Sequence, residues 1–223
     1  MIPLRDVIPS RTTPYITVTI ILLNTLAWLY EVAMPERMLN RFIFMYGVVP
    51  AAFAPATLVT SMFLHGSWSH VIGNMWYLWI FGDNVEDRVG HGRFIVFYLL
   101  CGIAAAFGQV AMAPESVTPM VGASGAIAGV MGAYFVLYPH SRVLTLIPWI
   151  FIQIVELPAL MLLGFWFLMQ FINAGAVAAT AASRGGGVAF AAHVVGFLAG
   201  VLGIFVFRRR DRDDYWDRTE YGR

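Results

Sequence analysis

The chain has 223 residues, of which 59% are hydrophobic and only 12% charged, and its formal net charge is +1. This balance lies far from that of a soluble globular domain, so the sequence predicts a protein embedded in a bilayer. The single cysteine, Cys101, excludes an internal disulfide, and the absence of lysine removes one class of catalytic base.

Six apolar segments are long enough to cross roughly 30 Å of hydrocarbon as helices. They span approximately 14–33, 63–82, 94–112, 122–138, 155–175 and 188–207. The first is expected to be a retained helix and not a cleaved signal peptide, because five more follow it. The predicted fold class is an all-α polytopic membrane protein, a bundle of six transmembrane helices.

Two further stretches are expected to lie at the membrane surface. Residues 31–56 are apolar but interrupted by prolines and a glycine, which favours a structured loop. Val143–Leu157 is apolar but broken by Pro148, and we expect a short interfacial or bent extension there. Residues 1–207 would then form one membrane domain, and residues 208–223 a short charged tail.

The distribution of arginines predicts the orientation of these spans. Six spans place both termini on one side, and that side collects eleven of the fourteen arginines, against Arg37, Arg41 and Arg184 on the other. Because basic residues are enriched in cytoplasmic loops, both termini are predicted to be cytoplasmic. The arginine-rich tail is interpreted as an anchor for this topology in preference to a lipid-specific site.

Polar residues on three of the spans fall at one predicted depth. Ser124 and His193 each lie 15 residues from the cytoplasmic end of their span, and His70 lies 13 residues from the end of its own. At about 1.5 Å per residue, all three sit about 20–22 Å above the cytoplasmic boundary. Asn74 lies one turn deeper, on the helix face that carries His70. Such side chains are costly in hydrocarbon unless they face a partner or water, so this plane is a candidate functional site.

Some of these residues also have a purely structural explanation. A serine in a transmembrane helix often bonds its own i−4 carbonyl or lets a neighbouring helix approach, so Ser124 alone does not predict catalysis. His65 is close enough to the interface to be wetted, and it is weaker evidence for a buried site than His70.

The residues around Ser124 are small. Nine of the twelve from Gly122 to Ala133 are glycine, alanine or serine, and the sixth span carries Gly196 and Gly200. Small residues let helix backbones approach closely. We therefore expect the fourth and sixth spans to pack tightly and to bring Ser124 Oγ within hydrogen-bond reach of His193.

The possible catalytic arrangements narrow by elimination. A Ser–Lys dyad is excluded because the chain has no lysine. A Ser–His–Asp triad lacks a carboxylate at this depth, since Glu156, the acid assigned to the fifth span, falls in its cytoplasmic half. A dyad of Ser124 and His193 remains. A zinc site is disfavoured because His65 and His70 are five residues apart with no acid between them, and we expect neither a metal nor a cofactor.

Three motifs in this order resemble those of the rhomboid family of intramembrane serine proteases. They are His65-Gly66 through His70 and Asn74, then Gly122-Ala123-Ser124-Gly125, then Ala192-His193-Val194-Val195-Gly196 with Gly200. The resemblance implies that Ser124 attacks the scissile carbonyl and that His193 is the general base. It also implies an oxyanion hole made by His70, Asn74 and the Ser124 backbone N–H. The glycines expected to support the motifs are Gly122, Gly125, Gly196 and Gly200.

Two positions depart from patterns found in some members. A Trp–Arg pair of the first loop is absent from Ala56-Thr57-Leu58, and Ala128 stands where a tyrosine would stack on the catalytic histidine. Neither change removes a group that acyl transfer needs. The sequence leaves open what holds His193 in its working tautomer.

The resemblance also implies partners and a location. Substrates would be single-span or polytopic membrane proteins in the lipid bilayer, cut near their outer boundary where small residues loosen the helix, and no nucleic acid is expected. The short termini favour a bacterial inner membrane. Residues 183–187, above His193, form either a hinge for a substrate gate or a plain flexible connector.

Two other functions stay open. An inactive rhomboid-like protein would bind membrane clients without cutting them, although the presence of both Ser124 and His193 argues against it. A transporter, or a haem- or metal-binding membrane protein, would use the histidines as ligands. The lack of inverted-repeat signals and of paired deep acids argues against this second alternative.

Overall fold

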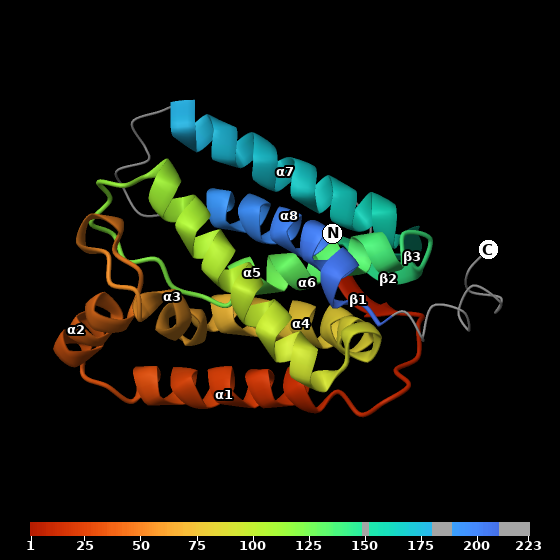
Figure 1. The fold of residues 1–223 in the computed structure, drawn as a ribbon, viewed down its shortest axis with the longest axis horizontal. Helices are drawn as coiled ribbons and strands as arrows, with labels where there is room; N and C mark the ends of the chain where they lie inside the picture. Colours follow the sequence, from red (N-terminus) through yellow and green to blue (C-terminus); the bar gives the residue numbers. More distant parts are fainter. Residues whose placement is uncertain (149–151, 180–188, 210–223) are drawn as a thin grey trace.

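The computed structural model describes residues 1–148, 152–179 and 189–209. Its helices are α1 (Tyr15–Val32), α2 (Glu36–Tyr46), α3 (Thr57–Thr60), α4 (Trp68–Val89), α5 (His91–Met112), α6 (Ser124–Leu137), α7 (Ala159–Ala179) and α8 (Phe190–Phe207). Figure 1 shows the long helices gathered around α6, with α1 and α7 on opposite sides of the bundle.

Four of the described helices, α1, α5, α7 and α8, are long and apolar enough to cross a membrane. They correspond to the expected segments at 14–33, 94–112, 155–175 and 188–207. The helix α7, however, begins only at Ala159. The segment expected at 63–82 becomes helical only at Trp68, and α6 has 14 residues, fewer than the segment expected at 122–138.

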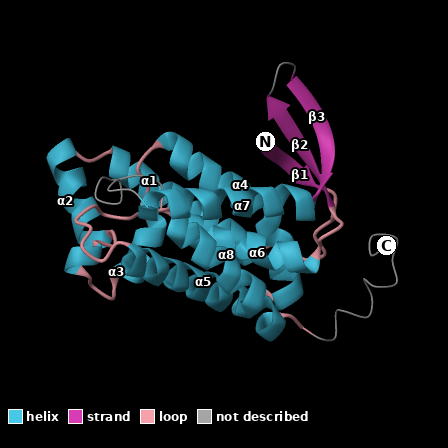
Figure 2. Cartoon of the chain, turned by 90° about the horizontal axis from the view of Figure 1, so that it is seen from above, coloured by secondary structure: helices cyan, strands magenta, loops and turns pink. Residues whose placement is uncertain are grey.

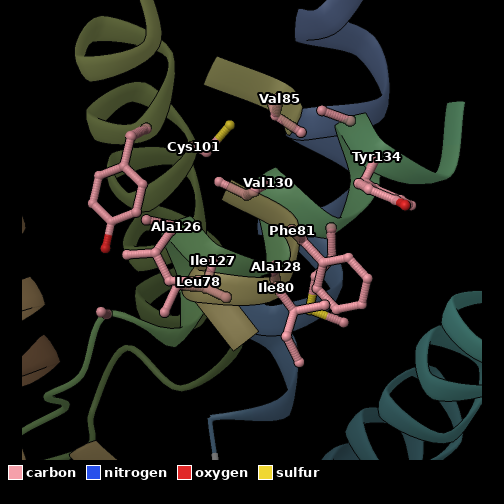
Figure 3. Close-up of a cluster of buried hydrophobic side chains, with 14 of the residues drawn as sticks. Leu78, Ile80, Phe81, Val85, Cys101, Ala126, Ile127, Ala128, Val130 and Tyr134 are labelled. Carbon is pink, nitrogen blue, oxygen red and sulfur yellow. The ribbon is translucent and has the colours of Figure 1, made fainter. Parts of the chain in front are cut away.

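The helix α6 is the centre of the bundle. Every residue from Gly125 to Tyr134 is buried, and α6 contacts α4, α5, α7 and α8. Figure 3 shows Leu78 and Phe81 of α4 and Cys101 of α5 in the cluster around it. The many glycines and alanines of α6 let these neighbours pack close to its backbone, so the predicted small-residue contact forms the core.

A small sheet corrects the expectation of an all-α fold. The strands β2 (Arg142–Pro148) and β3 (Ile152–Pro158) form an antiparallel hairpin, and β1 (Ile2–Asp6) pairs with the other edge of β2. Figure 2 shows the strands projecting beyond the helices at one end. The hairpin replaces the interfacial extension predicted for Val143–Leu157. This run is rich in valine, isoleucine and threonine, which favour a pleated strand.

The hairpin also moves Glu156 out of the predicted fifth span. Glu156 lies in β3, where its carboxylate accepts a hydrogen bond from the Arg142 guanidinium at 3.1 Å. The two side chains are 46% and 69% exposed, so this ion pair belongs to the surface and adds little stability. The expectation that Glu156 belongs to a membrane helix is therefore wrong.

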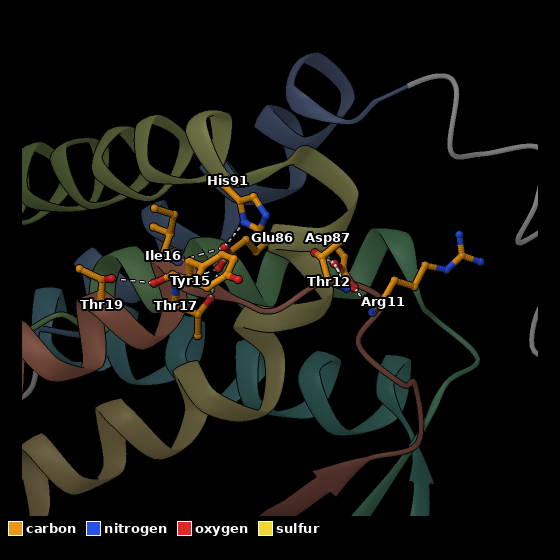
Figure 4. Close-up of polar contacts among 9 residues, drawn as sticks. All are labelled: Arg11, Thr12, Tyr15, Ile16, Thr17, Thr19, Glu86, Asp87 and His91. Carbon is orange, nitrogen blue, oxygen red and sulfur yellow. Dashed lines mark hydrogen bonds and ion pairs between the residues drawn. The ribbon is translucent and has the colours of Figure 1, made fainter.

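An acidic residue near the end of α4 caps α1 (Figure 4). The Glu86 carboxylate accepts hydrogen bonds from the Ile16 N–H at 3.0 Å and from the Thr17 N–H and hydroxyl at 2.8 and 2.7 Å. The helix begins at Tyr15 after Pro14, which offers no capping side chain. A carboxylate from another helix thus satisfies the first free N–H groups of α1 and complements its dipole.

Asp6 ties β1 to the helix bundle. Its carboxylate accepts a hydrogen bond from the Tyr134 hydroxyl at 2.7 Å and one from the Asn84 side-chain amide at 2.9 Å. Burial is the main cause that raises the pKa of Asp6 to about 7. The Tyr134 hydrogen bond opposes this shift, and the negative charge of Asp83 adds to it. The folded state consequently favours the protonated carboxyl group.

We expect the stability contributed by Asp6 to fall as the pH rises from about 4 to about 7. Its folded pKa is above its unfolded one, so the folded protein holds an extra proton in this window, and the stability is complete below the window and lost above it. Each pKa unit is worth about 1.4 kcal/mol. Thermal unfolding in detergent at about pH 5 and about pH 8 should show a larger loss for the wild type than for Asp6→Asn. Equal losses would contradict the assignment.

Candidate active site

Ser124 is the first residue of α6, and a glycine sets its position. Gly122 has a φ of +121°, which L side chains rarely adopt, and its N–H donates to the Ser61 carbonyl at 2.9 Å. The chain thereby turns from the preceding loop into the helix within two residues. The Ser124 backbone N–H lies among those of the first helical turn, which have no acceptor within the helix.

Glycines bring α8 against α6. A Cβ at Gly196 would overlap the Gly125 carbonyl, and a Cβ at Gly200 would overlap the α6 backbone one turn further along. The two backbones are in direct contact, as small residues permit. His193 lies one turn before Gly196, and its Nε2 is 2.8 Å from Ser124 Oγ. Ser124 Oγ therefore lies within hydrogen-bond distance of His193, as expected.

A third side chain, from α7, contacts the other nitrogen of the His193 ring. Gln170 Oε1 lies 2.8 Å from His193 Nδ1. An amide oxygen carries no proton, so Nδ1 is the donor and Nε2 is left to accept the Ser124 hydroxyl proton. Trp166, one turn earlier on α7, lies beside the ring with centroids 5.8 Å apart. Sequence reasoning missed Gln170, although an amide inside an apolar span is the same signal that identified Asn74.

His70 and Asn74 of α4 converge on Gly122. A Cβ at Gly122 would lie 2.7 Å from His70 Nε2 and 3.6 Å from Asn74 Nδ2. The Gly66 N–H donates to His70 Nδ1 at 3.5 Å, which leaves the ring proton on Nε2. Two N–H donors from α4 thus face the turn that carries Ser124.

His65 supports this arrangement and is not wetted at an interface as expected. It is 1% exposed, and its Nε2 lies 3.0 Å from Asn74 Nδ2, so the ring accepts one of the two amide protons. The carboxylate of Glu31, buried on α1, accepts hydrogen bonds from the His65 N–H at 3.2 and 3.3 Å. Sequence reasoning overlooked Glu31 because a charge at the end of an apolar run usually marks the interface.

A small cavity adjoins Ser124 on the side of α5. Its volume of about 20 Å³ is room for one water molecule. Most of its walls are backbone or short side chains, from Ser61, Gly102, Ala105, Ala106, Gly122, Gly125, Ala126, Ala189 and Ala192. The cavity therefore fits only a small chemical group beside the Ser124 side chain.

Part of the predicted region lies outside the described residues. This holds for residues 183–187, the expected hinge or connector, and for the tail from residue 210 onward. Within the described chain, the four motif glycines lie where the fourth and sixth expected spans meet or where the chain turns into α6. The serine, both histidines and the asparagine of the predicted site lie together at one end of the bundle.

The fold and the site together define a multi-pass integral membrane protein with a partly buried serine–histidine pair between two of its helices. Residues 52–210 match a family model described as a rhomboid domain. The chain belongs to the rhomboid family.

Curated relatives come from several compartments. The chain is 30% identical to Rhomboid protein 1, mitochondrial, of Saccharomyces cerevisiae over 151 residues. This aligned region covers 66% of this chain and 40% of the relative. It is 40% identical over 76 residues to Rhomboid protease GluP of Bacillus subtilis, 34% of this chain and 14% of the relative. It is 33% identical over 87 residues to Rhomboid-like protein 11, chloroplastic, of Arabidopsis thaliana, 39% of this chain and 30% of the relative. The matches thus span less than half of each relative.

Proposed function

We propose that this protein is an intramembrane serine endopeptidase that cleaves transmembrane segments near their outer boundary. The observation that carries the proposal is the 2.8 Å contact between Ser124 Oγ and His193 Nε2. A serine hydroxyl is a weak nucleophile until a base takes its proton during attack. The sequence similarity to a protein named a rhomboid protease also supports a protease function.

The proposed reaction proceeds through an acyl-enzyme. Ser124 Oγ bonds to the scissile carbonyl carbon while its proton passes to His193 Nε2, and a tetrahedral intermediate forms. Its collapse breaks the C–N bond, and His193 gives the proton to the leaving amine. Water then attacks the ester carbonyl and passes a proton to His193. The second collapse releases the carboxylic acid and returns the proton to Ser124 Oγ.

The developing oxyanion needs donors near the start of α6. The candidates are His70 Nε2, Asn74 Nδ2 and the Ser124 backbone N–H, all of which lie around Gly122 or follow it directly. Fixed donors in a water-poor site stabilise such a charge because they need no reorganisation during the reaction. The bond from Asn74 to the buried His65 ring uses one amide proton and leaves the other for the oxyanion.

We assign six spans, formed by α1, α4, α5, α6, α7 and α8, with both termini cytoplasmic and residues 1–207 as one domain. At the end of the bundle that we assign to the cytoplasm, the Arg209 N–H after α8 donates to the Arg88 carbonyl of α4, and the Val7 N–H after β1 donates to the Arg142 carbonyl of β2. The arginines of this end support the orientation.

The shortness of α6 sets the depth of the proposed site. Its 14 residues rise only about 21 Å, less than the roughly 30 Å of the hydrocarbon core. With its C-terminal end at the cytoplasmic boundary, the N-terminal Ser124 would lie about 9 Å below the outer one. Water would have to reach it through a polar opening on that side.

Substrates would be single-span or polytopic membrane proteins. Their helices would enter from the lipid and unwind locally, because a hydrogen-bonded helix hides its carbonyls from attack. The small cavity beside Ser124 favours short side chains at the cleavage position. A bacterial inner membrane is our proposed location, and cell fractionation of the tagged chain in its host would test it.

The proposal predicts that a fluorophosphonate probe labels Ser124 covalently. An activated serine attacks the phosphorus and expels fluoride, whereas ordinary serines react negligibly. Purified protein in detergent should carry one probe per chain, located on Ser124 by peptide mass spectrometry. Ser124→Ala should lose the label, and Ser116→Ala, which changes a loop serine outside the site, should keep it. Absence of labelling together with absence of cleavage would favour the inactive, client-binding alternative.

A further inference from the structure

On the side that faces away from Ser124, the His193 ring makes a polar contact with α7. Gln170 Oε1 on α7 accepts the Nδ1 proton at 2.8 Å. The neighbours Met169 and Phe171 are 38% and 59% exposed, whereas Leu163 on the same helix face as Gln170 is fully buried. Gln170 thus belongs to the face that α7 turns toward α8, and helix packing fixes its direction.

Only a hydrogen-bond acceptor at His193 Nδ1 can make this contact. A neutral imidazole carries its proton on either nitrogen, and only the Nδ1–H form leaves Nε2 able to take a proton from Ser124. An oxygen at Nδ1 selects that form and sets the plane of the ring. In serine proteases an aspartate does this work, and in papain-like cysteine proteases an asparagine amide stands in the same place.

We propose that Gln170 is a positioning residue for the reaction, so that the site is a Ser124–His193–Gln170 arrangement drawn from α6, α8 and α7. The inference rests on the proposed protease function and supplies what the sequence left open, the group that orients His193. Trp166 limits the ring from the side, but its contact offers no acceptor for Nδ1. A neutral amide adds no charge to the buried site, so its part is to fix tautomer and orientation.

Three substitutions at one position separate orientation from structure. Gln170→Leu keeps the size and removes the acceptor, Gln170→Asn keeps the amide but is one methylene too short, and Gln170→Glu keeps both acceptor and reach. We expect the first two to lower kcat about 10- to 100-fold with KM little changed, since a positioned base is worth about 10²–10⁴. Gln170→Glu should recover most of the loss, and its low-pH limb of activity should move to higher pH because a carboxylate favours the protonated ring.

A second readout does not depend on cleavage. In the Ser124→Ala background, ¹⁵N NMR of histidine-labelled protein should show the Nδ1–H tautomer of His193 when Gln170 is present. The same measurement on the Gln170→Leu variant should show a mixture of the two tautomers. The matched control is Gln153→Leu, which changes an exposed glutamine of β3 outside the site and should leave kcat and the His193 signal unchanged.

The outcomes distinguish this inference from the function on which it rests. If Ser124→Ala cleaves as well as the wild type, the protease proposal fails. If Ser124→Ala is inactive but Gln170→Leu and Gln170→Asn keep the wild-type kcat and tautomer, only the role of Gln170 is overturned. Equal losses in the Leu, Asn and Glu variants, with lowered melting temperatures, would show a structural role and would also overturn it.

Discussion

Replacing Ser124 or His193 with alanine is expected to reduce cleavage of a transmembrane substrate by about 10⁴-fold or more in kcat. The 2.8 Å contact makes the two side chains one chemical unit, so loss of either removes the proton transfer that activates the other. Purified variants would be compared with the wild type in detergent against a panel of single-span proteins. Product would be quantified on gels and the cleaved bond located by mass spectrometry.

The effects of the two substitutions on kcat are expected to be non-additive, which gives a stricter test of the pair. The double variant Ser124→Ala/His193→Ala should be no slower than either single variant, because the unit is already broken. His140→Ala, which changes an exposed histidine away from the pair, is the matched control and should cleave normally. Substantial cleavage by Ser124→Ala would end the proposal of a serine nucleophile.

Adding one methyl group at Gly200 is expected to cost about 3 kcal/mol of stability and most of the activity. A Cβ at Gly200 would overlap the carbonyl oxygen and carbon of Gly129, and backbone cannot move aside as a flexible side chain can. Gly200→Ala must therefore push α8 away from α6. Because Ser124 and His193 lie on these two helices, their contact should lengthen as well.

Gly175→Ala is the matched control for the packing prediction. A Cβ at Gly175 would have no neighbour within 4 Å, so the same substitution on α7 should be neutral or slightly stabilising, as alanine favours helix over glycine. Thermal unfolding and the cleavage rate would be measured for both variants. A Gly200→Ala protein as stable as Gly175→Ala would mean that α6 and α8 are not in backbone contact.

The spatial grouping of the site was predictable from the sequence because depth in a membrane can be counted along a helix. Ser124, His193 and His70 were expected in one plane, and they lie at one end of the bundle. Small residues gave the second part of the prediction, since they indicate where helices touch. Depth along a helix and the positions of small residues both depend only on regular helix geometry, so neither prediction requires the loop structures.

The residues that sequence reasoning missed act through contacts between segments distant in the chain. Gln170 and Glu31 meet partners 23 and 34 residues away, and no spacing rule predicts which nitrogen an amide will face. His65 was part of a predicted motif, but its burial and its contact with Asn74 were not expected. The β2–β3 hairpin was missed for another reason. The hydrophobicity of its apolar residues suits an interfacial segment as well as a strand, and only their β-branching favours the strand.

The pairing of β1 with β2 has a consequence for how the chain is made. Ile2 lies opposite Leu146, so β1 has no partner until about 140 further residues have been synthesised. Such distant pairings form slowly because the loop between them must close first. The sheet should therefore close only after α6, which precedes β2 in the chain, has been synthesised, and β1 would then pair beside a helical core that formed before it.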